Sequence, residues 1–202
     1  MCIRDRIHGA HGYLIDNFFW EGTNIREDIY GGSIEKRSNF VKEIVEAIRS
    51  RVTNNFIVGL RFSQWKQHDF DAKLAQTPDE LEKVIMPPVN AGLDYLHSSM
   101  RRFWESEFPD SKENLAYWTK KISDITTIGV GSVGLDSDFI DMMAPANPTS
   151  IDKAIEDISS NKYELIAVGR ALISDPNWVI KMKEGRFDEL IPYTKESLLT
   201  LY

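Results

Sequence analysis

Short apolar runs alternate with segments of helical periodicity along the chain. The runs 56–62, 93–97, 126–130 and 165–168 are rich in apolar residues, and they recur about every 35 residues. Runs of this kind, which do not alternate between apolar and polar positions, are typical of parallel strands covered on both faces. We therefore expect buried parallel strands there, and the end of a further strand within residues 7–13.

Helical patterns fill the intervals between the first runs. Ser33 is expected to cap a helix with one apolar face, which carries Phe40, Val41, Ile44, Val45 and Ile48. The sequence Thr77-Pro78-Asp79-Glu80 is typical of a capping box with proline at the first helical position. Because proline lacks a backbone N–H, Pro87-Pro88 is expected to interrupt or end that helix.

Three further helices are indicated in the second half of the chain. Apolar residues at helical spacing begin at Leu115 and again at Ile151, and Asp175-Pro176 opens a last helix through Trp178 and Met182. The alternation of strand and helix predicts a parallel α/β fold. Element order alone is compatible with both a doubly wound sheet and a (β/α)₈ barrel.

Residues 1–6 do not fit this pattern. They read Met1-Cys2-Ile3-Arg4-Asp5-Arg6, which is too charged for a buried parallel strand. We expect residues 1–6 to be a non-native, artefactual start or else a frayed terminus, and residues 7–202 to form one domain. No linker or low-complexity tract marks a second domain.

Composition excludes several classes of function. The 202 residues are 42% hydrophobic and 27% charged, which is ordinary for a soluble globular protein. A net charge of −7 argues against binding to a nucleic-acid backbone. No apolar stretch approaches the ~18 residues of a membrane helix. Cys2 is the single cysteine, so a disulfide framework is excluded and a reducing, cytoplasmic compartment is expected.

The densest candidate site is the sequence His8-Gly9-Ala10-His11-Gly12-Tyr13. In barrels the carboxyl ends of strands and the following loops build the active site. Two imidazoles three residues apart can donate hydrogen bonds to one oxygen, and the tyrosine can deliver a proton. A metal pair is the alternative, but the helical zinc motif is absent and two histidines are too few ligands, so no metal is expected.

Two glycine-containing loops follow the last predicted strands. Gly131-Ser132 lies in the first loop and Gly169-Arg170 in the second. Glycines let backbone N–H groups approach an anion, and arginine can bind a phosphate in bidentate fashion. The pair of loops matches the phosphate site of barrels, which follows strands seven and eight. The alternative is two tight turns with a surface arginine.

Arg61 lies within an apolar run, where an unpaired charge is costly. We expect Arg61 to meet an anion or an electron-rich ligand, or alternatively a carboxylate from a neighbouring strand. His97 also ends a strand and is expected to be a core or mouth-lining residue. Trp65, His68 and Trp104 lie in loops near strand ends and are weaker candidates for the lining of a pocket.

These motifs together resemble one known family. The stretch from His8 to Arg37 reads HGAHGYLIDNFFWEGTNIREDIYGGSIEKR. It is similar to the signature of the old yellow enzyme family of NADH:flavin oxidoreductases, an HxxHGY loop followed by NxRxDxYGGSxExR. Residues 58–63 resemble the family's fifth-strand segment, and residues 130–134 and 167–176 resemble its two FMN-phosphate segments.

The resemblance implies a (β/α)₈ barrel that holds FMN, accepts hydride from NADH or NADPH, and reduces electron-poor alkenes or similar small molecules. By position, His8 and His11 would bind the substrate's oxygen and Tyr13 would protonate its α-carbon. Arg61 would stabilise negative charge on the reduced flavin ring. The phosphate would be held by Gly131, Ser132, Gly169 and Arg170.

A complete barrel typically needs about 250 residues. The chain is therefore expected to be an incomplete barrel, from the end of strand four through helix eight. We expect residues 7–202 to bind FMN weakly or not at all on their own, and an open sheet edge makes a homo-oligomer an option. The alternatives are a non-catalytic fragment and another phosphate-binding barrel enzyme that uses the histidines differently.

Overall fold

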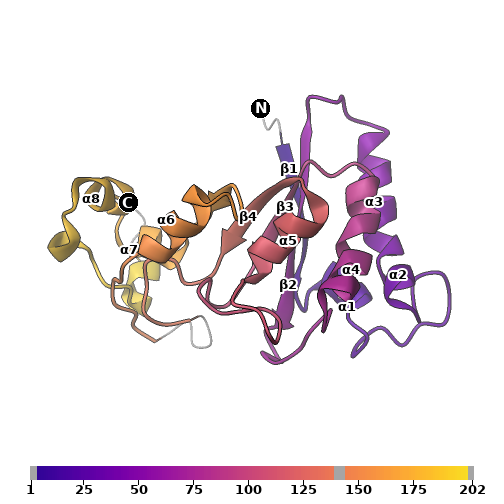
Figure 1. The fold of residues 1–202 in the computed structure, drawn as a ribbon, viewed down its shortest axis with the longest axis horizontal. Coiled ribbons are helices and arrows are strands. Elements are labelled where there is room, and N and C mark those ends of the chain that lie inside the picture. The colour runs from indigo at the N-terminus through magenta and orange to yellow at the C-terminus, as the bar shows by residue number, and fades with distance from the viewer. Residues whose placement is uncertain (1–3, 139–143, 200–202) are drawn as a thin grey trace.

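A parallel sheet organises the computed structural model, which describes residues 4–138 and 144–199 (Figure 1). Its strands in this part of the chain are β1 (Arg4–His11), β2 (Ile57–Lys66), β3 (Tyr95–Ser99), β4 (Thr126–Val130) and β5 (Leu165–Ile166). Every neighbouring pair is parallel, and the spatial order β1-β2-β3-β4-β5 follows the chain. A doubly wound sheet reverses its strand order at a switch point, so this order is that of a barrel wall.

Helices connect the strands. In Figure 1, α3 and α4 lie together on one side, and α6, α7 and α8 lie on the other side of β4. The helices are α1 (Leu14–Phe19), α2 (Ile34–Arg37), α3 (Asn39–Arg49), α4 (Pro78–Asn90), α5 (Leu115–Ser123), α6 (Asp152–Ser159), α7 (Arg170–Ser174) and α8 (Trp178–Glu184). Short 3₁₀ helices span Phe187–Glu189 and Lys195–Leu198. No helix of the described ranges has the length and apolarity to cross a membrane.

The core lies between the sheet and α3, α4 and α5. Val58, Leu60 and Phe62 of β2 belong to one buried apolar cluster with side chains from these helices. Because successive strand residues point to opposite faces, Arg61 lies on the other face of β2. His8, Arg61 and His97 are register partners across β1, β2 and β3, so they form a row on that face, which is the inner face of a barrel.

Two expected helices, one capped by Ser33 and one ending near Pro87-Pro88, differ from the prediction. Ser33 caps the short α2, the chain turns at Ser38, and the predicted apolar face belongs to α3. Helix α4 continues past both prolines to Asn90. Pro88 has no N–H to offer the carbonyl of Val84, and the buried Ser38 hydroxyl donates to that carbonyl instead, at 3.0 Å.

The strand ends also differ from the prediction. Arg4, Asp5 and Arg6 were expected to be too charged for a buried parallel strand, and they form an exposed one, since β1 begins at Arg4. Their side chains are exposed, so the charges stay hydrated while the backbone pairs with β2. The rest of the 1–6 segment, including Cys2, lies outside the described residues. Strand β5 is shorter than the predicted run 165–168.

Candidate active site

A cavity of about 440 Å³ lies at the carboxyl ends of the strands. It is lined by every residue that the sequence proposed for catalysis or cofactor binding: His8, His11, Tyr13, Arg61, Gly131, Ser132, Gly169 and Arg170. A larger cavity, of about 740 Å³, lies at the amino ends of the strands, around Arg4 and Ile57. Active sites of barrels lie at the carboxyl ends, so the smaller cavity is the candidate.

An irregularity in β1 brings the two imidazoles together. In a regular strand, residues three apart point to opposite faces. The register of β1 against β2 shifts between Gly9 and His11, and both His11 (φ 65°) and Gly12 (φ 82°) are left-handed. The His8 and His11 ring centroids are consequently 5.5 Å apart, and the Tyr13 ring lies 5.1 Å from His8.

The surroundings favour the neutral form of both imidazoles, with His11 half-buried and His8 largely exposed. Burial first, and then the charge of Arg61, lower the pKa of His11 to about 3. The same causes lower the pKa of His8. His11 stacks on Trp65 with ring centroids 4.4 Å apart, and its Nε2 lies 2.8 Å from Ser99 Oγ. A neutral imidazole retains one N–H donor, so each ring can donate one hydrogen bond at neutral pH.

Arg61 reaches the same cavity from the middle of β2. Its Nη2 donates to Ser99 Oγ at 3.0 Å, and its buried Nε has no hydrogen-bond partner. Within residues 4–138 and 144–199, Arg61 forms no ion pair with a carboxylate. Burial lowers the pKa of Arg61. A buried guanidinium with an unused donor is suited to an electron-rich or anionic ligand.

The two glycine-containing loops meet at Arg170. Its Nη2 donates to the carbonyl of Ser137 at 2.5 Å and lies 3.4 Å from Ser132 Oγ, while its buried Nη1 has no partner. A Cβ at Gly131 would lie 2.8 Å from the carbonyl oxygen of Met100, so only glycine fits there. A Cβ at Gly169 would meet nothing within 4 Å.

These features fit a flavin nucleotide. The loop with Gly169 leaves backbone open beside Arg170, which suits a phosphate. The side chain of Arg61 lines the same cavity, which suits the electron-rich edge of a ring. In the part of the chain that the structure describes, no group of three or more His, Cys, Asp or Glu side chains is placed to hold a metal ion.

The weaker sequence candidates have mixed outcomes. Trp65 lines the cavity, whereas His68 and Trp104 are not among its lining residues. His97 is buried, with Nδ1 2.9 Å from Arg6 Nη1. The cavity has several further lining residues, which are Gln67, Ser99, Met100, Arg101, Val130, Val133, Leu135 and Ile173. Ser99 is the most important residue that the sequence did not predict. Its position at the end of β3 could have indicated that it lines the cavity.

Comparisons with known proteins identify the family of the chain. Residues 6–189 match the model of the family described as NADH:flavin oxidoreductase / NADH oxidase. The chain is 34% identical to an NADH oxidase of Thermoanaerobacter brockii over 192 residues, covering 91% of this chain and 27% of that protein. It is 29% identical to an NADPH dehydrogenase of Clostridium acetobutylicum over 194 residues, covering 94% of this chain and 52% of that protein.

The fold has a solved counterpart. The structure of morphinone reductase in complex with tetrahydroNAD superposes with a TM-score of 0.66 at 22% identity, covering 89% of this chain and 43% of that one. This likeness agrees with the part of a (β/α)₈ barrel that the strand order indicates. The chain spans between about a quarter and about half of these relatives. Because the family model matches most of the sequence, the chain belongs to the NADH:flavin oxidoreductase / NADH oxidase family.

Proposed function

We propose that this chain forms the flavin- and substrate-binding wall of an FMN-dependent oxidoreductase that takes hydride from NADH or NADPH and reduces electron-poor alkenes. The observation that carries the proposal is the shared cavity. It sets the pair His8 and His11 and the phenol of Tyr13 beside two arginines with unused donors, Arg61 and Arg170.

The proposed cofactor site has two ends. At one end, Arg170 Nη1 and the backbone of Gly131, Ser132 and Gly169 hold the phosphate. At the other end, Arg61 donates to the pyrimidine edge of the ring and stabilises negative charge there. When bound, FMN supplies hydride transfer, which no side chain can provide, and the protein supplies position and electrostatics.

His8 and His11 are proposed to hold the acceptor. Their pKa values are lowered, so they are neutral N–H donors that bind a carbonyl or nitro oxygen. Two hydrogen bonds to that oxygen draw electrons from the conjugated alkene and make its β-carbon more electrophilic. Trp65 stacks on His11 and Ser99 contacts its Nε2, which fixes the orientation of this ring before the acceptor arrives.

Tyr13 is proposed to donate the proton that completes the reduction. Its side chain is 51% exposed and its ring lies beside His8 at the cavity. A phenol can donate its O–H proton to the α-carbon of the acceptor while the β-carbon receives hydride. The proton that Tyr13 gives up is then restored from solvent, which reaches this side chain freely.

The test separates the two half-reactions. Tyr13→Phe should slow alkene reduction on the order of 100-fold, the scale of a lost general acid, while flavin reduction by NADH or NADPH stays unchanged. Tyr30→Phe is the matched control, because Tyr30 is a half-buried tyrosine that contacts Glu43 and does not line the cavity. Stopped-flow absorbance of the flavin follows both steps, and equal loss of both would refute the role of Tyr13.

A non-catalytic role is the second candidate, and one observation favours it. Large apolar side chains such as Ile57 and Leu165 are exposed in the cavity at the amino ends of the strands. Exposed apolar surface of this kind is typical of a wall that packs against a partner rather than one that works alone. A flavin fluorescence titration of the chain distinguishes the two: saturable binding supports the oxidoreductase, and absence of binding supports the non-catalytic role.

A further inference from the structure

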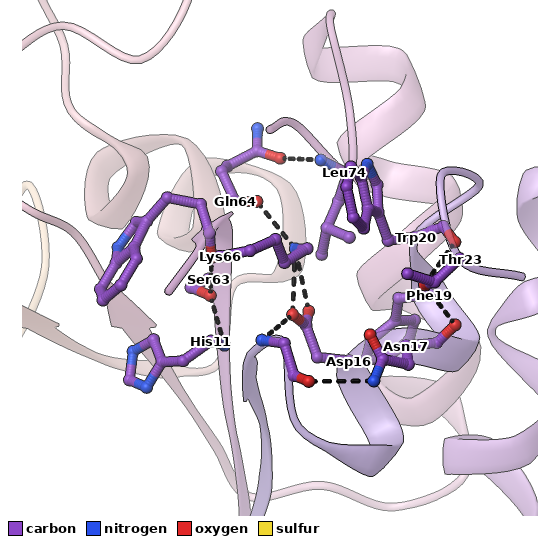
Figure 2. A network of polar contacts seen from close by, with 12 residues as sticks. His11, Asp16, Asn17, Phe19, Trp20, Thr23, Ser63, Gln64, Lys66 and Leu74 are labelled. Atoms are coloured by element: carbon purple, nitrogen blue, oxygen red, sulfur yellow. Dashed lines mark hydrogen bonds and ion pairs between the residues drawn. The ribbon is translucent and has the colours of Figure 1, made fainter. Parts of the chain in front are cut away.

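A buried ion pair between Lys66 and Asp16 lies close to His11 (Figure 2). Lys66 is the last residue of β2, and Asp16 lies in the first turn of α1. Lys66 Nζ is 3.1 Å from Asp16 Oδ1 and 3.0 Å from Oδ2, and both side chains are 0% exposed. Neither residue lines the cavity, so the proposed chemistry does not use them directly.

Both charged groups have further partners. Lys66 Nζ donates to the carbonyl of Gln64 at 2.8 Å and lies 5.6 Å from the centre of the Trp20 ring. Asp16 Oδ2 accepts a hydrogen bond from the backbone N–H of Gly12 at 2.6 Å. Asn17 donates from Nδ2 to the carbonyl of the same Gly12 at 2.9 Å. Both polar groups of the Gly12 backbone are therefore held by side chains of α1.

Gly12 is the residue between His11 and Tyr13. It and His11 are left-handed, a conformation that is costly for histidine and that persists only where the surroundings impose it. The N–H of His11 is also held, by Ser63 Oγ at 2.9 Å. A small rotation at Gly12 would swing the Tyr13 ring relative to the imidazoles, so the Gly12 bonds set the distance between proton donor and acceptor-binding groups.

The pair is poorly suited to a role in stability alone. Burial raises the pKa of Asp16 to about 6 and lowers the pKa of Lys66, although each partner's charge opposes the shift. Both shifts mean that the folded state disfavours the ionised form of each group. Replacing a buried ion pair by neutral residues of similar volume is often neutral or stabilising.

We propose that Asp16 and Lys66 are positioning residues, which fix the Gly12 backbone and thereby the placement of Tyr13 relative to His8 and His11. The significance for catalysis rests on the proposed function. Lys66 orients the Asp16 carboxylate, and the carboxylate holds the Gly12 N–H. The ion pair thus connects the end of β2 to the loop after β1, two segments 50 positions apart in the sequence.

Two double variants test this role without leaving a buried charge unpaired. Asp16→Ala with Lys66→Met removes both charges and the acceptor for the Gly12 N–H. Asp16→Asn with Lys66→Met removes both charges but keeps an amide oxygen at the acceptor position. Asp157→Asn is the matched control, because Asp157 is 1% exposed, pairs with Lys153 and Lys162, and lies in α6 away from the cavity.

The first readout needs no cofactor. Amide hydrogen exchange measured by NMR should show Gly12 exchanging about tenfold or more faster in the alanine double variant, since a charge-assisted hydrogen bond is lost. The asparagine double variant should regain most of the protection, and Asp157→Asn should leave Gly12 unchanged. Unchanged exchange at Gly12 in the alanine double variant would overturn the proposal.

The second readout uses the FMN-loaded protein. Misplacement of a reacting group by about 1 Å can reduce a rate about 100-fold, so alkene reduction should fall on that scale in the alanine double variant and recover with asparagine. FMN affinity and melting temperature should stay near the parent values. Their parallel loss in both double variants would show a merely structural role. If the parent itself reduces no alkene while Gly12 exchange responds as expected, the proposed function fails and the positioning of Gly12 stands.

Discussion

Arg170 offers the sharpest test of the cofactor site, because the proposal gives it a single task. Its Nη2 is already occupied by the Ser137 carbonyl, and its Nη1 is buried without a partner. A bound phosphate would gain one new charge-assisted hydrogen bond from Nη1 once the guanidinium turns this buried atom toward the cavity that Arg170 lines. Such a bond contributes about 1.5–3 kcal/mol. At 1.4 kcal/mol for each factor of ten, Arg170→Ala should weaken FMN binding about 10- to 100-fold.

Riboflavin provides the internal control, since it carries the same ring without the phosphate. Arg170→Ala should leave riboflavin binding within about twofold of the parent, a change that is under about 0.5 kcal/mol. Titration of the chain into each flavin, followed by fluorescence, gives the dissociation constants. Arg186→Ala is the matched variant, because Arg186 lies outside the cavity and pairs with Glu184. Equal weakening of FMN and riboflavin would refute the assignment of the phosphate to Arg170.

Three other substitutions probe the site and the fold. Burial and then Arg61 lower the pKa of His11, so Arg61→Met should raise that pKa in an NMR titration, and an unchanged value would contradict the coupling. Burial, and then Arg61, lower the pKa of His97 from 6.5 to about 3, so the unfolded state binds more protons between these values. His97 therefore lowers the free energy of unfolding as the pH falls below 6.5, by about 2 kcal/mol at pH 5. The free energy of unfolding, measured with urea, should differ less between pH 7 and pH 5 in His97→Gln, by that amount. Thr77 Oγ1 accepts a hydrogen bond from the Glu80 N–H at 3.2 Å at the start of α4. Thr77→Ala should therefore lower the free energy of unfolding by about 1 kcal/mol in the same urea assay. An unchanged free energy would show that the cap is dispensable.

The sequence predicted which residues line the cavity, but it did not predict the geometry that brings them together. The HxxHGY motif and the two glycine-containing loops lie at strand ends, and carboxyl ends of parallel strands meet at one edge. Arg61 was found by its charge within an apolar run in the middle of β2. His8 and His11 face the same cavity only because β1 is irregular, and no local sequence pattern predicts that irregularity. Ser99 was missed because serine is common at strand ends and only the register with His11 and Arg61 gives it a role.

The errors in the fold have the same origin, namely contacts between distant segments. The prolines of α4 do not end the helix, because Ser38 satisfies the carbonyl of Val84 that Pro88 leaves without a donor. The pair of Asp16 and Lys66 was equally invisible, since its members lie 50 positions apart and neither belongs to a motif. Arg4 to Arg6 form strand because their side chains are exposed at the start of β1, where the charges stay hydrated.

The most direct measurement is a crystal structure of the chain with FMN. The account predicts the phosphate within hydrogen-bond distance of Arg170 Nη1 and of the backbone N–H groups of Gly131 and Ser132. It also predicts the ring against Arg61, with one face open toward His8 and Tyr13. An FMN molecule bound with its phosphate at the imidazoles, or bound in the cavity at the amino ends of the strands, would contradict the account.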